Sequence, residues 1–229
     1  MDISIIIPAY NEEAHIEKLV VYLKENSGKI TTEVIVADGG STDNTIDLAR
    51  KAGALAVASP ARGRGTQMNY GASFATGAIL YFVHADTFPA KNYTEDIFSA
   101  ASEGYSLGRY RTRFLSPKKL LRINEWFTRF DLFICMGGDQ TLFIKKELFD
   151  SLGGFNEEMM LMEEYEFCTR ARARGKYKIM TGAALISARK FEKNTWLRVQ
   201  MANYKIVQLY KKGAPSQILS ETYKRMLKW

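Results

Sequence analysis

The stretch that predicts the fold is ISIIIPAYNEE, residues 3–13. Its first five residues are mostly apolar and β-branched, which is typical of a strand buried on both faces of a parallel sheet. Pro8 ends this run. Asn11 can cap a helix whose apolar residues recur at helical spacing from Ile16 to Leu23. The pattern predicts a strand, a loop and a helix at the start of an α/β fold.

The same alternation continues to residue 83. Further strands are expected at 33–37, 55–58 and 79–83, and further helices after a cap at Ser41 or Thr42 and at 68–75. Such alternation indicates a mostly parallel sheet with helices on both faces. Ligands of such sheets bind beyond the carboxyl ends of the strands. Three polar groups follow strands and should therefore share one edge: Pro8-Ala9-Tyr10, Asp38 and His84-Ala85-Asp86.

The second half of the chain is less regular. It predicts strands at 107–114, with outward-facing arginines, and at 141–144, and helices at 120–133, 146–152, 163–174, 196–212 and 216–228. No linker rich in Pro, Gly or Ser separates the halves. We expect one domain over residues 1–190 and a helical C-terminal appendage over 191–229 that is not an independent domain.

Composition narrows the class of protein. The 229 residues are 46% hydrophobic and 25% charged, as in ordinary globular proteins. Two cysteines, Cys135 and Cys168, exclude a disulfide scaffold and a Cys-rich metal site, and their apolar neighbours predict inert buried thiols. The chain opens without a basic, apolar leader, and no apolar run approaches the roughly 18 residues that span a bilayer. We expect a cytoplasmic protein that touches the inner face of a membrane, if at all, from the side.

The net charge of +7 favours anionic partners. No Walker-type loop is present, and Gly63-Arg64-Gly65 is half of a dinucleotide fingerprint. The basic loop 62–65 precedes a helix, where it either attracts phosphate or is simply solvated. No helix carries a long basic stripe, so nucleic acid is not an expected partner.

Three acidic groups could carry chemistry. Asp86 could hold Mg²⁺ or Mn²⁺ against a diphosphate, or be a turn residue beside a core histidine. Asp38 could accept hydrogen bonds from a sugar hydroxyl or a base, or serve the turn. Glu163 and Glu164 begin a helix, whose dipole favours the ionised form that a general base needs, or they simply complement that dipole. Spacing alone leaves these alternatives open.

Together these elements resemble glycosyltransferase family 2. The resemblance covers roughly residues 3–190 and rests on residues 5–13, 38–45, His84-Ala85-Asp86, and Gly153-Gly154-Phe155 ahead of the paired glutamates. Three stretches are similar to a bacterial subgroup labelled as arsenosugar-biosynthesis or radical-SAM-associated glycosyltransferases: GRGTQMNYG (63–71), HADT (84–87) and GGDQ (137–140).

The resemblance implies a GT-A fold, a nucleotide-sugar donor and an inverting mechanism. The donor of our leading hypothesis is linked to UDP or to another nucleotide, and the acceptor is a hydroxyl. It places the catalytic base of the family on Glu164, with Glu163 orienting or capping. The metal motif of the family falls on His84 and Asp86, with its first acid replaced, so Mg²⁺ or Mn²⁺ would depend on Asp86. The resemblance assigns Gly138, Asp139 and Gln140 to the acceptor side. It assigns these residues to the nucleotide sugar: Pro8, Ala9, Tyr10, Glu12, Asp38, Gly39, Ser41, Arg64, Asn69, Ala85 and Asp86.

Two rival functions remain beside this one. A nucleotidyltransferase can use a similar sheet, but its basic Gly-rich loop would directly follow the first strand. A non-enzymatic module for RNA or an anionic membrane would use the basic charge. The helix at 196–212 mixes apolar and basic residues, which suits an acidic membrane surface, a packed helix or a homodimer contact: Trp196, Leu197, Val199, Ile206, Val207 and Leu209 among Arg198, Lys205, Lys211 and Lys212.

Overall fold

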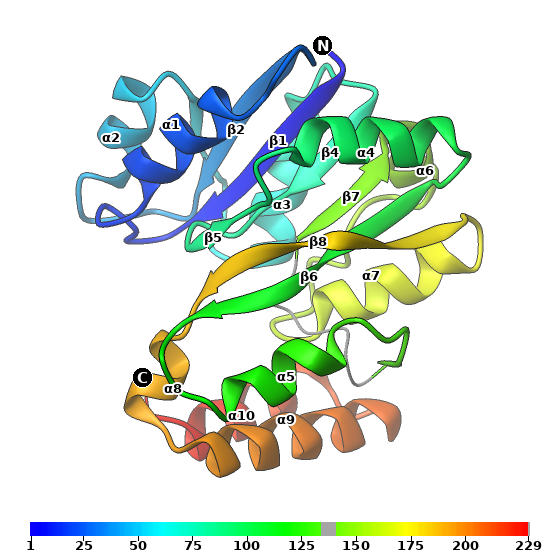
Figure 1. Cartoon of the computed structure of the whole chain (residues 1–229). Coiled ribbons are helices and arrows are strands. Elements are labelled where there is room, and N and C mark those ends of the chain that lie inside the picture. The colour runs from blue at the N-terminus through cyan, green and yellow to red at the C-terminus, as the bar shows by residue number, and fades with distance from the viewer. Residues whose placement is uncertain (134–140, 229) are drawn as a thin grey trace.

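The structure is a computed structural model that describes residues 1–133 and 141–228. In this part of the chain eight strands form one sheet in the order β3-β2-β1-β4-β7-β6-β8-β5 (Figure 1). Most neighbours are parallel, and the antiparallel pairs are β4–β7, β6–β7 and β5–β8. The strands are β1 (Ile3–Ala9), β2 (Thr32–Asp38), β3 (Leu55–Ala58), β4 (Ile79–Phe82), β5 (Thr87–Phe88), β6 (Leu107–Leu115), β7 (Leu142–Lys145) and β8 (Tyr177–Ser187).

Helices cover both faces of the sheet. On one face Ile3, Ile5 and Ile7 pack against α1, α2 and α4. On the other face Ile6 packs among residues of α3, α6 and α7. The two sides of β1 follow from the alternation of side chains along a strand. The helices are α1 (Ile16–Glu25), α2 (Thr45–Lys51), α3 (Arg64–Ser73), α4 (Tyr93–Ser102), α5 (Leu121–Phe127), α6 (Lys146–Ser151), α7 (Glu163–Arg172), α8 (Arg189–Lys193), α9 (Trp196–Lys211) and α10 (Ser216–Met226).

The strand register brings the predicted polar groups to one edge. Ala9 at the end of β1 pairs with Asp38 at the end of β2. On the other side of β1, Ile6 pairs with Phe82, the last residue of β4. His84 follows two residues later. The predicted α/β class and the mostly parallel sheet are therefore confirmed.

The predicted helix caps are wrong. Helix α1 begins at Ile16, and Asn11 lies in a left-handed turn with φ 52°. The Asn11 side chain instead accepts a hydrogen bond from the backbone N–H of Thr42 at 2.8 Å. Helix α2 begins at Thr45, three or four residues beyond the two predicted cap positions, Thr42 and Ser41. The loops after β1 and β2 contact each other instead of capping helices. Capping preferences describe only local sequence, so they do not predict such a tertiary contact.

The second half departs further from the expectations. The helix predicted at 120–133 ends at Phe127, and strand β8 and helix α4 were not predicted. Arg109 does not face outward: it is 4% exposed and donates hydrogen bonds to the carbonyl oxygens of Thr128 and Phe130. Those carbonyls belong to residues just after α5. The buried guanidinium therefore supplies hydrogen-bond donors to the backbone that follows this helix, a contact that the sequence pattern does not show.

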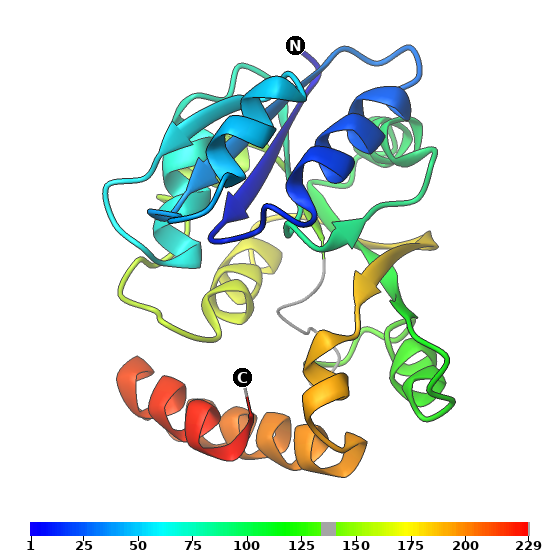
Figure 2. The same cartoon turned by 90° about the vertical axis from the view of Figure 1, so that its left-hand side faces the viewer.

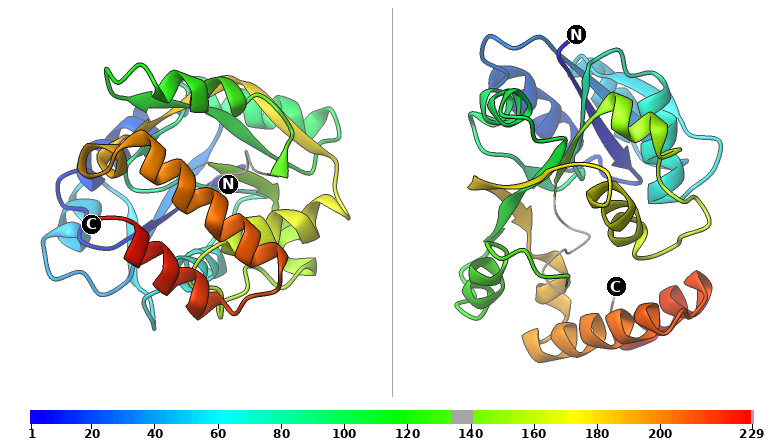
Figure 3. Two further views of the ribbon diagram at one scale, coloured as in Figure 1. Left: turned by 90° about the horizontal axis from the view of Figure 1, so that it is seen from below. Right: turned by 90° about the vertical axis from the view of Figure 1, so that its right-hand side faces the viewer.

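The C-terminal helices form a third apolar cluster. Helices α9 and α10 lie side by side at the end of the molecule opposite the N-terminus (Figures 2 and 3). Val199, Ile206 and Val207, which the sequence left open to a membrane contact, are buried there. The same cluster includes Met162 and Tyr165 at the start of α7. None of the helices described is long and apolar enough to cross a bilayer.

Candidate functional site

The loop after β2 is held by the carboxylate of Asp38. This side chain is fully buried and accepts hydrogen bonds from the backbone N–H groups of Gly40 at 2.9 Å and Ser41 at 2.8 Å, and from the Ser41 hydroxyl. Gly40 has φ +86°, which favours glycine. In the described chain Asp38 shapes the loop, and its contact with a nucleoside stays a prediction.

A buried glutamine ties the strand ends together. Gln67, on α3, donates from Nε2 to the carbonyl oxygens of Ala9 at 2.7 Å and Ala37 at 2.9 Å. A Cβ added at Gly39 would lie 2.9 Å from the Gln67 amide. A larger residue at position 39 would displace the Gln67 amide from these carbonyls, and the loops after β1 and β2 share this one support.

Arg64 begins α3 and points at the paired glutamates. Its Nε lies 2.7 Å from Oε1 of Glu163. This contact is an ion pair without hydrogen-bond geometry, because neither carboxylate oxygen of Glu163 accepts a hydrogen bond from the described residues. Glu163 is 1% exposed, so it lies under Arg64. A basic residue at the site thus has a buried counter-charge.

Glu164 turns to a different partner. Its Oε1 lies 3.1 Å from Nε2 of His84, and its other oxygen is buried without a hydrogen-bond partner in the described part of the chain. Neighbours on a helix point about 100° apart, which explains the separate partners of Glu163 and Glu164. Met162 before them has φ 70°, a left-handed conformation at the helix start. The structure therefore brings the predicted metal motif and the predicted base together.

Burial and charge shift the pKa of both members of this pair. Burial raises the pKa of Glu164, and the neighbouring His84 and Arg64 only partly offset it. Burial alone would lower the pKa of His84, but the carboxylate of Glu164 outweighs it and the net shift is upward. A carboxylate with a raised pKa accepts a proton more readily, which suits a general base.

Arg189 is a site residue that the sequence did not reveal. It begins α8, after the unpredicted strand β8, and contacts Oε1 of Glu12 at 2.6 Å and Oδ2 of Asp86 at 3.1 Å. Its side chain is 54% exposed, whereas those of Glu12 and Asp86 are mostly buried. Because strand β8 was not predicted, nothing in the sequence placed Arg189 near the carboxyl edge of the sheet. It adds a second cation to the predicted site.

The predicted metal-binding residues provide few ligands for a divalent ion. Asp86 supplies one carboxylate, which Arg189 contacts, and Nε2 of His84 faces Glu164. No group of three His, Cys, Asp or Glu residues in the described ranges could hold a metal ion. Mg²⁺ prefers oxygen ligands and often takes several from substrate phosphates. The residues therefore fit a metal only as a partial set that a diphosphate would complete.

The remaining predicted residues divide into three groups. Pro8, Ala9 and Ala85 lie at the same edge, where the Tyr10 ring stacks under Arg62 at 3.5 Å. Asn69 contacts a neighbouring loop instead: its amide bonds the backbone of Phe155 in both directions and Oε1 of Glu157. The acceptor-side residues Gly138, Asp139 and Gln140 fall outside the described residues. Cys168 is partly buried against the apolar clusters, and this burial raises the pKa of its thiol to about 12, as expected of an inert cysteine.

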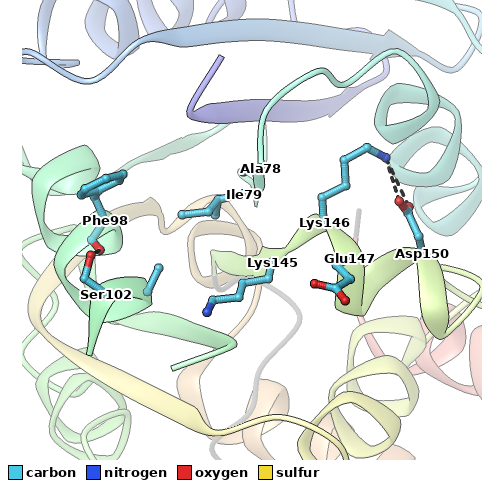
Figure 4. A pocket seen from close by; sticks show the side chains of 9 residues that line it. Ala78, Ile79, Phe98, Ser102, Lys145, Lys146, Glu147 and Asp150 are labelled. Atoms are coloured by element: carbon cyan, nitrogen blue, oxygen red, sulfur yellow. Dashed lines mark hydrogen bonds and ion pairs between the residues drawn. The ribbon is translucent and has the colours of Figure 1, made fainter. Parts of the chain in front are cut away.

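One surface pocket lies elsewhere. It is lined by residues that include Ile79, Phe98, Lys145 and Lys146 (Figure 4). Ile79 is the first residue of β4, so this pocket is at the opposite end of that strand from His84 and Asp86. The Lys146 ammonium there pairs with Asp150 on the same helix at 3.0 Å. Because ligands of such sheets bind beyond the carboxyl ends, the pocket is not the candidate site.

The fold is that of the GT-A glycosyltransferases. Staphylococcus aureus TarS in complex with UDP-GlcNAc superposes with a TM-score of 0.66 at 20% identity, over 82% of this chain and 58% of that one. Glucosyl-3-phosphoglycerate synthase from Mycobacterium tuberculosis, with Mn²⁺, UDP and glucosyl-3-phosphoglycerate, has a TM-score of 0.64 at 20% identity, over 93% of this chain and 81% of that one.

Sequence comparison is more specific. The family described as Glycosyl transferase family 2 matches residues 4–152, and the chain belongs to this family. The succinoglycan biosynthesis protein ExoA of Rhizobium meliloti is 25% identical over 76% of this chain and 59% of its own length. The glycosyltransferase AglE of Haloferax volcanii is 24% identical over 76% of this chain and 62% of its own length. The chain thus spans about three fifths of these relatives.

Proposed function

We propose that the protein is an inverting glycosyltransferase that moves a sugar from a UDP-linked donor to an acceptor hydroxyl. The observation that carries this proposal is Glu164, a buried carboxylate with one oxygen on His84 and the other without a hydrogen-bond partner among the described residues. Family membership and the UDP and UDP-GlcNAc complexes of TarS and the synthase support it.

In this mechanism Glu164 takes the proton of the acceptor hydroxyl as that oxygen attacks the anomeric carbon. The bond from that carbon to the diphosphate oxygen breaks on the opposite face, which inverts the configuration. Negative charge develops on the leaving diphosphate, and Arg64 and Arg189 lie at the strand edge to stabilise it. Removal of a general base typically slows such a step about 10²–10⁴-fold.

Asp86, with His84 beside it, would hold Mg²⁺ or Mn²⁺ as the donor binds. The ion would add positive charge at the diphosphate. Mn²⁺ with UDP in the mycobacterial synthase supports this assignment. We expect Asp86→Ala to erase any Mn²⁺ enhancement of UDP binding, whereas Asp38→Ala weakens binding with or without Mn²⁺. Equal enhancement in wild type and Asp86→Ala would contradict the metal assignment.

The decisive experiment separates binding from chemistry. Glu164→Gln keeps the shape of the side chain and removes its basicity, so sugar transfer or donor hydrolysis should fall about 10²–10⁴-fold. The UDP-induced thermal shift should stay nearly unchanged. Glu166→Gln is the matched control, because Glu166 lies on the same helix and pairs with Arg170. Normal turnover of Glu164→Gln would place the base elsewhere, and Glu164→Asp should retain more activity than Glu164→Gln.

Several finer assignments rest on the sequence. The three motifs quoted above support membership of the bacterial arsenosugar-associated subgroup. We also propose a cytoplasmic enzyme without a nucleic-acid partner, and a peripheral contact with the inner face of the membrane. Sedimentation velocity would test whether two copies of the chain pair as a homodimer.

A further inference from the structure

An apolar face at the C-terminal end of the molecule lies exposed on two helices. Its members at α5 are Ile123, Phe127 and Leu120, the residue just before the helix, which are 43–53% exposed. Those on α9 are Leu197, Met201 and Tyr204, which are 58–62% exposed. We name this set the α5–α9 face. Large exposed apolar patches on a folded domain mark interaction sites.

The two helices are joined by side-chain contacts. Oδ1 of Asn124 on α5 accepts hydrogen bonds from Nε1 of Trp196 at 2.7 Å and from Nε2 of Gln200 at 3.4 Å, both on α9. Figure 1 shows α5 beside α9. The exposed residues of the two helices are therefore close enough to act together.

The helical repeat places each set on the exposed side of its own helix. At about 100° per residue, Leu120 and Phe127 lie on the side of Asn124 away from buried Leu121. On α9 the same step puts Leu197 and Met201 on the side of Trp196 away from buried Val199. Both stripes thus face away from the buried side of their helices and lie beside the contact between the helices.

Basic residues are concentrated on the two segments that carry this face. Residues 196–212 contain four basic residues and no acidic one. Residues 118–129 contain four basic residues and one acid, Glu125, which accepts the Phe114 N–H at 2.8 Å and so faces β6. The exposed Trp126 ring packs against Phe127 and Phe130, with Arg129 5.6 Å from its centroid. Aromatic side chains with basic neighbours are typical of the bilayer interface.

We propose that the α5–α9 face docks on an anionic lipid bilayer. Apolar side chains would enter the boundary between headgroups and acyl chains, and the neighbouring lysines and arginines would contact anionic headgroups. The occupant is lipid and not a basic or neutral protein surface, because residues 196–212 carry no acid and the one acid among residues 118–129 faces β6. The proposal does not depend on the glycosyltransferase activity.

The test is co-sedimentation of the full chain with vesicles of phosphatidylcholine alone and with added phosphatidylglycerol. Wild type should bind the anionic vesicles and lose that binding as salt rises. Phe127→Glu should weaken binding about tenfold, because it replaces an inserted ring by a repelled charge. Phe98→Glu is the matched control: Phe98 is 45% exposed against 44% for Phe127, but it lies on α4.

Three outcomes would overturn the proposal. Wild type could fail to bind anionic vesicles, or bind them as well after Phe127→Glu. The third is a concentration-dependent dimer that Phe127→Glu dissociates, with no vesicle binding, which would make the face a contact between copies. An unchanged UDP-induced thermal shift in Phe127→Glu would show that the variant is folded, and it distinguishes loss of docking from failure of the proposed function.

Discussion

Two adjacent glutamates at the start of α7 have different environments. Glu163 lies under Arg64, and Glu164 faces His84. A histidine thus occupies the first position of the metal motif and contacts the proposed base. The hydrogen bond fixes the orientation of the Glu164 carboxylate and leaves its second oxygen for an acceptor hydroxyl.

The raised pKa of Glu164 predicts the acid limb of the pH profile. The base acts only when deprotonated, so the rate of UDP release should fall as the pH drops through the Glu164 pKa, above the ordinary value of 4.5. His84 lowers this pKa, so His84→Gln should move the limb to higher pH. Glu166→Gln should leave it in place. A limb at or below pH 4.5 in the wild type contradicts the assignment.

Arg189 should contribute to diphosphate binding. Loss of a charge-assisted contact costs about 1.5–3 kcal/mol, so Arg189→Ala should weaken UDP binding roughly tenfold or more. The measurement is calorimetric titration without metal. Lys193→Ala, at the other end of α8, serves as the control and should bind normally. Equal UDP affinity in wild type and Arg189→Ala would show that Arg189 only pairs with Glu12 and Asp86 and does not contact the diphosphate.

At the scale of elements, α3 organises the strand edge. Arg64, its first residue, points into the site and pairs with Glu163. Gln67 forms hydrogen bonds with the ends of β1 and β2, and Asn69 forms one with the loop before α7. The sequence predicted this helix only from residue 68, because Gly63-Arg64-Gly65 is typical of a loop. The tertiary contacts of Gln67 extend the helix through this stretch.

Gln67→Ala should destabilise the fold by about 1–3 kcal/mol, because it removes two buried hydrogen bonds that join the ends of β1 and β2. Urea unfolding checks this. Ser73→Ala tests the same helix at an exposed hydroxyl that bonds only within the helix, to the Tyr70 carbonyl, and should change stability little. A Gln67→Ala midpoint equal to that of wild type would mean that water replaces the amide.

At the scale of the molecule, the C-terminal helices share a cluster with the start of α7. Leu219 on α10 is fully buried in the cluster that includes Met162 and Tyr165, the residues on either side of the paired glutamates. This packing supports the expectation that residues 191–229 are an appendage of the domain over 1–190 and do not fold separately.

Leu219→Ala should therefore lower the stability of the whole chain. Loss of a buried leucine typically costs about 2–5 kcal/mol. In urea, the far-UV circular dichroism signal and the UDP-binding signal should disappear in one transition, at a lower urea concentration than in wild type. The neighbouring Ile218→Ala is the control, because Ile218 is 44% exposed. Two separate transitions would show that α9 and α10 unfold on their own.

The sequence by itself determined the α/β class, the four strands before residue 84 and the edge at which Asp38, His84 and Asp86 meet. Those features depend on local periodicity and on the rule that parallel strands end at one edge. Only the tertiary structure decided that His84 faces Glu164, that Arg189 reaches Asp86, and that Arg109 is buried. Each of these contacts joins residues far apart in the chain through strands β6 and β8 or the start of α7. Their positions depend on packing between elements, for which a single sequence carries no periodic signal.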